Sequence, residues 1–246
     1  MNINEQIALN PEEEPIVTKR RFVAYFDIMG FKNMIKTKDT TDIYNQFKNL
    51  LDEIKNELKT HKYLSYSAFS DLIVIITEDD SDKSFTQLAD AALMMMRDTF
   101  FRYSWGMSGC IAKGVITYDE GRNIFLGQPI VDAYLTSEEL DYYGVVVHNS
   151  AYEDVTKYIA RKKKNKRASH LENLFKDERL YFKSGFYSEF HLRWFDFDLK
   201  KIYNPQKVHK EILKRLKDMS NAIHGKARRY IENTQDIILY NNPDNM

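Results

Sequence analysis

The chain has 246 residues, of which 43% are hydrophobic and 13% are aromatic. This is enough for one domain with a sizeable core and an appendage. The 36 basic and 36 acidic residues cancel, which excludes a protein-wide basic field for nucleic acid. The single cysteine, Cys110, excludes an intramolecular disulfide framework, and no apolar run approaches the roughly 20 residues that span a bilayer. The first residues also lack a signal-peptide pattern, so we expect a cytoplasmic protein with no membrane or nucleic-acid partner.

Hydrophobic periodicity predicts a regular succession of strands and helices through residue 148. Continuous apolar runs are typical of buried strands, and apolar residues at three- and four-residue spacing are typical of amphipathic helices. The expected elements are a strand at 22–28, a helix at about 42–60, two strands within 63–77 that meet near Ser70–Asp71, a helix at about 83–103, a strand–turn–strand over 107–127, a helix at 129–140 and a strand at 145–148. This order predicts an α+β fold: a ferredoxin-like βαββαβ core with an antiparallel central sheet, helices on one face and an extra αβ unit.

Outside this core, the sequence predicts a short arm and a long extension. Residues 1–20 are polar and are expected to form a flexible arm, followed by the core at 21–150. Residues 151–246 are expected to form a helical C-terminal extension that packs on the core or on a dimer partner. The basic run RKKKNKR at 161–167 favours a solvated loop, because no RNA-binding motif accompanies it. The last segment, RRYIENTQDIILY, is expected to form a short helix and a strand.

Two carboxylates are expected to meet at one edge of the central sheet. Asp27 lies at the end of the first strand, inside an apolar run where an unpaired charge is costly. Asp71 lies in the hairpin between the second and third strands. The first and third strands of a ferredoxin-like sheet are antiparallel neighbours, so the end of one faces the start of the other. Two hard oxygen donors there suit Mg²⁺ or Mn²⁺ with bound phosphates, although each aspartate alone could simply cap a turn.

The turn after Asp27 has features that suit phosphate binding. The amides of Met29, Gly30 and Phe31 lie where a helix is expected to begin, and the backbone N–H groups at a helix start attract phosphate. Gly30 also removes the side chain that would block a close approach. The sequence therefore predicts that these three amides bind a triphosphate beside the metal ions.

Several segments resemble the motifs of the class III nucleotide cyclases. YFDIMGF and FSDLIVI are similar to the two metal-binding motifs of that family. GCIAKGVI is similar to its RGAIxxG strand, and IFLGQPIVDAYLTSEELDYYGVVV to its GxxxxxAxxLE helix. The aromatic-rich motifs most resemble the bacterial cyclases of Pycsar antiphage defence, which make cyclic pyrimidine nucleotides. The resemblance runs from about Phe22 to His148, and RRYIENT is similar to an end motif of that group.

This resemblance implies a homodimer with nucleotide sites between the subunits. Asp27, Asp71 and the Ile28 carbonyl would hold two divalent ions, Mg²⁺ or Mn²⁺. The ribose 3′-hydroxyl would attack the α-phosphate and expel pyrophosphate, in the signal generator of an antiphage defence system. UTP is favoured slightly over CTP, on the resemblance alone. The alternatives are an adenylate or guanylate cyclase, a non-catalytic nucleotide-binding signalling protein of the same fold and, from the basic run alone, a nucleic-acid-associated palm-type protein.

The sequence differs from the family at the positions whose side chains stabilise the charge of the transition state. A gapless match places Val131 and Leu135 where ATP-using members often carry Asn and Arg, and neither side chain can do that work. Ser108 stands where a basic residue is expected. Lys113, in the same strand just before Gly114, is therefore the candidate catalytic cation, with Arg122 in the following turn as a second candidate.

Overall fold

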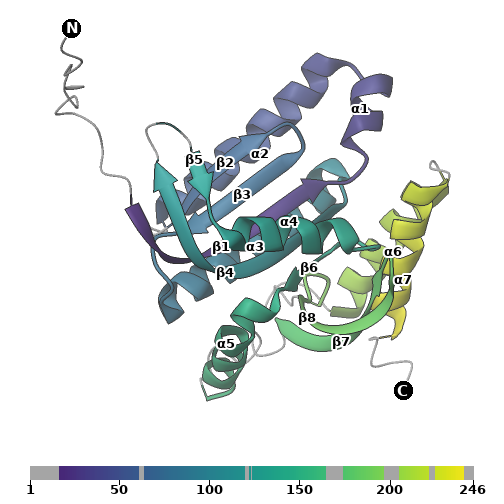
Figure 1. Cartoon of the computed structure of the whole chain (residues 1–246). Helices are drawn as coiled ribbons and strands as arrows, with labels where there is room; N and C mark the ends of the chain where they lie inside the picture. Colours follow the sequence, from purple (N-terminus) through teal and green to yellow (C-terminus); the bar gives the residue numbers. More distant parts are fainter. Residues whose placement is uncertain are drawn as a thin grey trace, which may run out of the picture.

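The structure is a computed structural model that describes residues 17–60, 64–119, 122, 124–164, 174–196, 205–221 and 225–240. The strands form one twisted sheet with helices packed around it, and α6 and α7 lie together at one end (Figure 1). The elements in order are β1 (Val17–Ile28), α1 (Phe31–Thr37), α2 (Thr40–Thr60), β2 (Leu64–Phe69), β3 (Leu72–Thr77), α3 (Asp82–Tyr103), β4 (Met107–Asp119), β5 (Ile124–Leu126), α4 (Gln128–Glu139), β6 (Gly144–Val147), a 3₁₀ turn (Asn149–Ala151), α5 (Tyr152–Lys164), β7 (Phe175–Phe182), β8 (Gly185–Leu192), α6 (Pro205–Asn221) and α7 (Lys226–Tyr240).

The strand order confirms the ferredoxin-like core. It runs β2-β3-β1-β4-β6-β8-β7, with β5 paired to β4 beside this path. β1 lies between β3 and β4 and is antiparallel to both, whereas β6 is parallel to β4. The central position of β1 explains why Phe22–Phe26 is buried on both sides and reads as an unbroken apolar run.

The sheet carries helices on both faces, which corrects the expectation of helices on one face only. On one face, the ring of Phe22 lies 5.1 Å from that of Phe85 in α3. On the other, the ring of Tyr25 lies 5.6 Å from that of Tyr134 in α4. Residues three apart in a strand point to opposite faces, so the two contacts show that α3 and α4 lie on opposite sides. Gly114 allows this close packing, since a Cβ there would lie 2.7 Å from the Pro129 ring.

The N-terminal boundary of the core lies earlier than predicted. β1 begins at Val17 and pairs with β4 as far as Tyr118, so residues 17–20, assigned to the flexible arm, belong to the sheet. The polar sequence there is tolerated because Lys19 and Arg20 lie at the exposed end of the strand, where they pair with Glu78 and Asp80. Residues 1–16 of the predicted arm lie outside the described residues.

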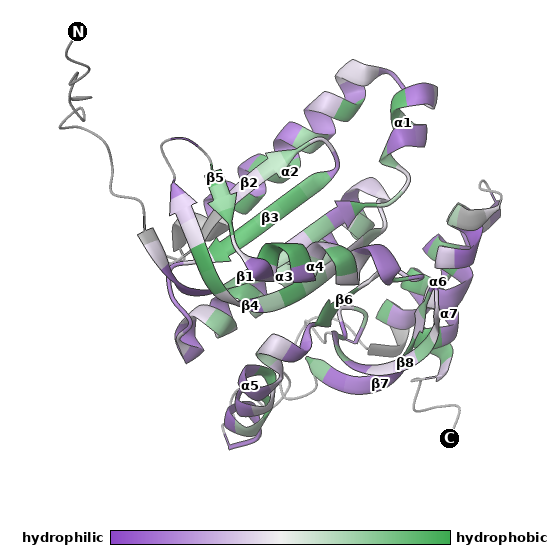
Figure 2. Ribbon diagram, viewed as in Figure 1, coloured by the Kyte–Doolittle hydropathy of each residue, from purple (hydrophilic) through white to green (hydrophobic). Residues whose placement is uncertain are grey.

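The C-terminal extension contains two strands that the sequence analysis did not predict. β7 and β8 form a hairpin, and β8 joins the central sheet through Val146 and His191. Figure 2 shows the reason: β3 is apolar along its length, whereas β7 carries hydrophilic residues and lacks the signal of a buried strand. The extension is therefore connected to the core through the edge of the sheet as well as through contacts of its helices.

Two further assignments in the extension are corrected. RRYIENTQDIILY lies in one helix, α7, because its buried residues recur at helical spacing, namely Tyr230, Ile231, Thr234, Ile237 and Ile238. The first four residues of the basic run, Arg161–Lys164, form the last turn of α5. Positive side chains there interact favourably with the negative end of the helix dipole. Residues 165–167 lie outside the described residues. No described helix is long and apolar enough to cross a bilayer.

Candidate active site

Asp27, near the end of β1, and Asp71, in the turn before β3, lie at the same edge of the sheet, as the sequence predicts. Asp27 pairs with Leu72 of β3, which is the residue after Asp71. The β2–β3 turn consists of Ser70 and Asp71, and Ser70 has a positive φ of 58°, a backbone conformation that tight hairpins require. The carbonyl of Asp71 accepts a hydrogen bond of 2.9 Å from the amide of Ile28. The hairpin tip is therefore attached directly to the end of β1.

The two carboxylates make this edge of the sheet strongly negative. Burial, together with the negative charges of Asp71 and Glu138, raises the pKa of Asp27 to about 6. The positive charge of Lys183 lowers the pKa of Asp27, but by less than the other contributions raise it. Asp27 faces the same side of the sheet as Tyr25, the side that α4 covers. A divalent cation would relieve this concentration of like charge.

The turn after β1 only partly matches the expected phosphate-binding turn. The amide of Met29 donates to the carbonyl of Gly106 at 2.9 Å, so this N–H group is already used within the chain and the prediction for it is wrong. Gly30 has a φ of 78°, begins α1 and has open space where a Cβ would lie. The Phe31 amide is in the first turn of α1, where N–H groups have no partner within the helix. Two of the three predicted amides thus stay candidates.

The structure does not bring Lys113 to the two aspartates. Lys113 lies opposite Phe22 in the β1–β4 pairing, five residues or roughly 17 Å along β1 from Asp27, and it points to the opposite face. Its ammonium group lies 3.0 Å from Asp154 of α5 and 3.3 Å from Asp80, over the ring of Phe22. Lys113 therefore neutralises a half-buried acidic cluster on the α3 face and is not placed to contact a substrate at Asp27.

The other residues of the predicted site lie as follows. Arg122 pairs with Asp119 at 2.9 Å, in the turn at the far end of β4. Ser108 lies opposite Asp27 in the β1–β4 pairing, and its hydroxyl lies 3.3 Å from the sulfur of Met29. Val131 and Leu135 are on α4 with exposed side chains.

Comparison with known proteins identifies the fold but not a sequence family. No protein-family model and no curated protein sequence matches the chain. Among solved structures, the catalytic core of a rhodopsin-guanylyl cyclase with converted specificity, in complex with ATPαS, is similar with a TM-score of 0.56 and 12% identity, covering 72% of this chain and 98% of that chain. The guanylate cyclase domain of RhGC from Catenaria anguillulae, in complex with GTP, has a TM-score of 0.51 and 15% identity, with coverages of 72% and 97%. The adenylyl cyclase CyaB from P. aeruginosa has a TM-score of 0.51 and 11% identity, with coverages of 73% and 96%.

This chain has the fold of a nucleotide cyclase catalytic domain. The similarity spans nearly the whole of each cyclase domain and just under three quarters of this chain. Identities of 11–15% establish the fold alone, so substrate and activity must be argued from the residues of this chain.

The donor set of this cyclase fold suits a hard divalent cation. Asp27 and Asp71 provide carboxylates, and the backbone carbonyl of Ile28 is a third oxygen on the same segment. The described residues contain no group of three or more His, Cys, Asp or Glu that could enclose a metal ion. Mg²⁺ commonly uses one or two protein carboxylates and fills its remaining positions with water and substrate phosphates, so the residues present fit such an ion.

Two charged residues beside Asp27 were not identified from the sequence. Glu138 lies in the last turn of α4, and Lys183 in the β7–β8 turn. The amide of Lys183 donates to the carbonyl of Glu139 at 2.7 Å, and its ammonium group contacts the carbonyl of Glu138. Lys183 could have been found only by predicting the β7–β8 hairpin, because that pairing carries its cation to the C-terminal end of α4.

Proposed function

We propose that this protein is a nucleotidyl cyclase that converts a nucleoside triphosphate into its 3′,5′-cyclic monophosphate and pyrophosphate. The observation that supports this most is the juxtaposition of Asp27 and Asp71 on central strands of a cyclase fold. Together with the Ile28 carbonyl, these residues would hold two divalent ions, Mg²⁺ or Mn²⁺. Bound there, such ions would lower the pKa of the attacking hydroxyl and neutralise the leaving phosphates.

The residues of the chain contribute mainly orientation to this reaction. The attack of a ribose hydroxyl on the phosphate of the same molecule needs alignment and no covalent intermediate. In this proposal the amides of Gly30 and Phe31 bind phosphate oxygens beside the carboxylates, because they lie at the start of α1. Lys113 has no catalytic role in this proposal, because it is paired to Asp154 on the other face of the sheet.

A homodimer is part of this proposal. The surface of α4 and β5 exposes Leu126, Val131 and Leu135, with 62%, 47% and 55% of each residue accessible. Large apolar side chains gathered on neighbouring elements are typical of surfaces that other proteins cover. A second copy of the chain docked there would bury them and place its own α4 near the substrate site.

The base of the substrate is the finer part of the proposal. UTP, and after it CTP, is favoured by the resemblance of the YFDIMGF and FSDLIVI motifs to pyrimidine cyclases, which also suggests a role in antiphage defence. Use of ATP or GTP is the alternative, since the similar structures are adenylyl and guanylyl cyclase domains. A non-catalytic nucleotide-binding role is a third candidate, because Val131 and Leu135 cannot stabilise transition-state charge.

One assay distinguishes these candidates. The purified protein is incubated with ATP, GTP, CTP or UTP and Mn²⁺, and cyclic products are measured by mass spectrometry. We expect cyclic UMP or cyclic CMP from the wild type and none from Asp71→Asn, while Asp52→Asn, at an exposed carboxylate of α2, keeps full activity. Tight nucleotide binding without product from any of the four would favour the non-catalytic role. Product from Asp71→Asn would overturn the metal assignment.

A further inference from the structure

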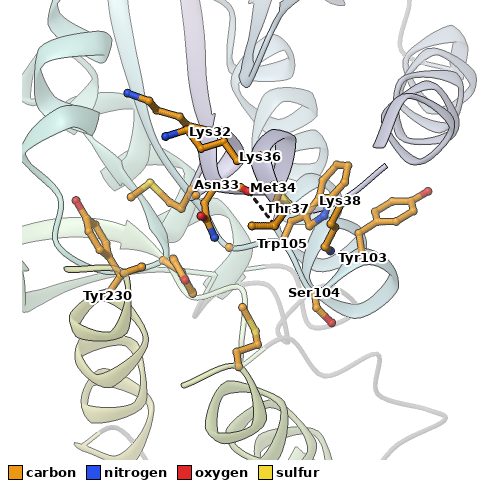
Figure 3. Close-up of a pocket in the computed structure, with 16 residues that line it drawn as sticks. Lys32, Asn33, Met34, Lys36, Thr37, Lys38, Tyr103, Ser104, Trp105 and Tyr230 are labelled. Carbon is orange, nitrogen blue, oxygen red and sulfur yellow. Dashed lines mark hydrogen bonds between the residues drawn. The ribbon is translucent and has the colours of Figure 1, made fainter. Parts of the chain in front are cut away.

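A pocket of about 1000 Å³ lies beside the proposed active site, between α1 and the C-terminal helices (Figure 3). Met29 and Gly30 form part of its wall, and Met219 of α6 and Tyr230 of α7 form another part. Neither Asp27 nor Asp71 lines it. The pocket is thus adjacent to the metal-binding segment but is built in part from the extension that follows the cyclase core.

The charge of the pocket is uniformly positive. Lys32, Lys36 and Lys38 line it, and no aspartate or glutamate does. In a chain with equal numbers of acidic and basic residues, this separation is notable. No ion pair with a described residue is formed by any of the three lysines. In Figure 3, Lys32 and Lys36 extend in the same direction from α1. Ammonium groups that have no such partner among the described residues suit a ligand with several phosphate oxygens.

The remaining wall is largely aromatic. Tyr103 and Trp105 lie next to Lys38, with ring centroids 5.0 Å apart. Tyr143 and Tyr230 stack at 6.3 Å and 13° on the other side. Trp105, Tyr143 and Tyr230 are almost fully buried, whereas Tyr103 is partly exposed, so the ring of Tyr103 is the flat surface on which an aromatic base would stack. Lysines and aromatic side chains in one cavity therefore match a ligand that has both a polyphosphate and a base.

α1 is the element that such a ligand would affect most. None of the residues of α1 is fully buried, so little packing holds this helix in place. α1 also begins at Gly30, directly after the segment that carries Asp27 and Ile28. A ligand held between α1 and α7 would restrict the movement of both.

We propose that this pocket is a second site, which binds a nucleoside polyphosphate without metal ions, and that its occupancy holds α1 and the Asp27–Gly30 segment in position. The binding part of this proposal stands by itself. The effect on the active site rests on the proposed cyclase function.

Binding is tested by calorimetry with the full chain in EDTA, using ATP, GTP, CTP, UTP and inorganic tripolyphosphate as probes. We expect at least one nucleotide to bind more tightly than tripolyphosphate, with equal affinity for wild type and Asp27→Asn/Asp71→Asn. Lys36→Gln/Lys38→Gln should weaken this binding by about tenfold or more, because it removes two of the three cations that line the pocket. Lys55→Gln, at an exposed lysine of α2, is the matched control and should change nothing.

Three results would overturn the second site: no nucleotide binding in EDTA at about 1 mM, undiminished binding by Lys36→Gln/Lys38→Gln, or loss of binding in Asp27→Asn/Asp71→Asn. The last would assign the nucleotide to the metal site. The regulatory effect is tested separately in Mn²⁺, where the rate of wild type should rise sigmoidally with nucleotide and that of Lys36→Gln/Lys38→Gln should not. A chain that binds nucleotide in EDTA but makes no cyclic product would refute the cyclase function and leave the pocket assignment intact.

Discussion

The guanidinium of Arg229 lies 2.6 Å from the carboxylate of Asp141, a buried residue between α4 and β6. The side-chain amide of Asn233 also donates to the carbonyl of Asp141 at 2.7 Å, and the Thr234 hydroxyl accepts from the amide of Tyr143 at 2.9 Å. These three residues belong to the RRYIENT motif. The motif therefore attaches α7 to the segment that leads into β6.

The first prediction is that Arg229 and its partner Asp141 contribute more to the free energy of unfolding than the neighbouring Arg228 does. Asp141→Ala should lower the free energy of unfolding by about 2–3 kcal/mol, because it removes the carboxylate that accepts hydrogen bonds from both Arg229 and the buried side-chain amide of Asn233. Arg229→Ala should cost about 1–2 kcal/mol, since it leaves the Asp141 carboxylate with fewer donors. Arg228→Ala is the matched control: its exposed pair with Glu232 should contribute below about 0.5 kcal/mol. Urea unfolding measures all three, and equal effects of the two arginines would contradict the assignment.

The second prediction concerns Lys113 and Asp154, which are 13% and 10% exposed. Lys113→Met should lower the free energy of unfolding by about 3–5 kcal/mol, because it leaves the buried carboxylate of Asp154 beside Asp80 without its cation. Lys113→Met/Asp154→Leu should be less destabilising than the sum of the two single changes. Thermal unfolding tests this.

The activity of the same variants tests the location of the active site. Because Lys113 lies on the face of the sheet opposite Asp27, the product formed per folded molecule should be unchanged in Lys113→Met. A selective loss of activity in well-folded protein, with normal metal affinity, would return Lys113 to the catalytic site.

The third prediction is that Asp27 weakens the metal-free fold. Its folded-state pKa of about 6 exceeds the usual 3.8, so its charge costs stability as the pH rises from about 4 through 6. Asp27→Asn should therefore have a higher free energy of unfolding than wild type in EDTA at pH 7.5, by about 1–3 kcal/mol at most. Its unfolding temperature should be higher as well. Asp52→Asn should show neither increase. Mn²⁺ should stabilise wild type and leave Asp27→Asn unchanged, and a Mn²⁺ shift that survives the substitution would contradict the metal site.

The fourth prediction is acid sensitivity centred on the β7–β8 hairpin. Burial by itself would raise the pKa of Glu178, but hydrogen bonds and charges from His191, Lys176 and Arg193 hold it to about 2. A depressed carboxyl pKa contributes stability that is complete above the unfolded-state value of 4.5 and is lost as the pH falls towards 2. We expect this to amount to roughly 2–3 kcal/mol.

His191 extends this sensitivity to milder acid. Burial lowers its pKa below 6.5, so the neutral ring must gain a proton on unfolding, and stability begins to fall once the pH drops below about 6.5. Glu178→Gln should flatten the dependence of unfolding free energy on pH between 5 and 3, as measured by urea titrations at each pH. A slope equal to that of wild type would contradict the role of Glu178.

The expected core was largely recovered because its signals are local. The apolar run before Gly30, the helical spacing in α2 and α3 and the turn at Ser70–Asp71 each depend on neighbouring residues alone. The facing of Asp27 and Asp71 also followed, since a two-residue hairpin and an antiparallel sheet leave little freedom of register.

Contacts between distant segments decided the rest. The β7–β8 hairpin has many polar residues and belongs to the sheet only through its pairing with β6, which no local pattern encodes. The prediction for the Met29 amide failed because Gly106, far along the chain, accepts its hydrogen bond.

The sequence by itself determined the order of the core elements and the placement of two carboxylates at one edge of the sheet, because periodicity and turn chemistry act over a few residues. Only the tertiary structure decided that Lys113 pairs with Asp154 and that Arg229 holds Asp141. The alternation of a strand does not say what packs against each face. The tertiary structure alone also joined α1 to α7 around a pocket lined by lysines, since those helices are separated by most of the chain.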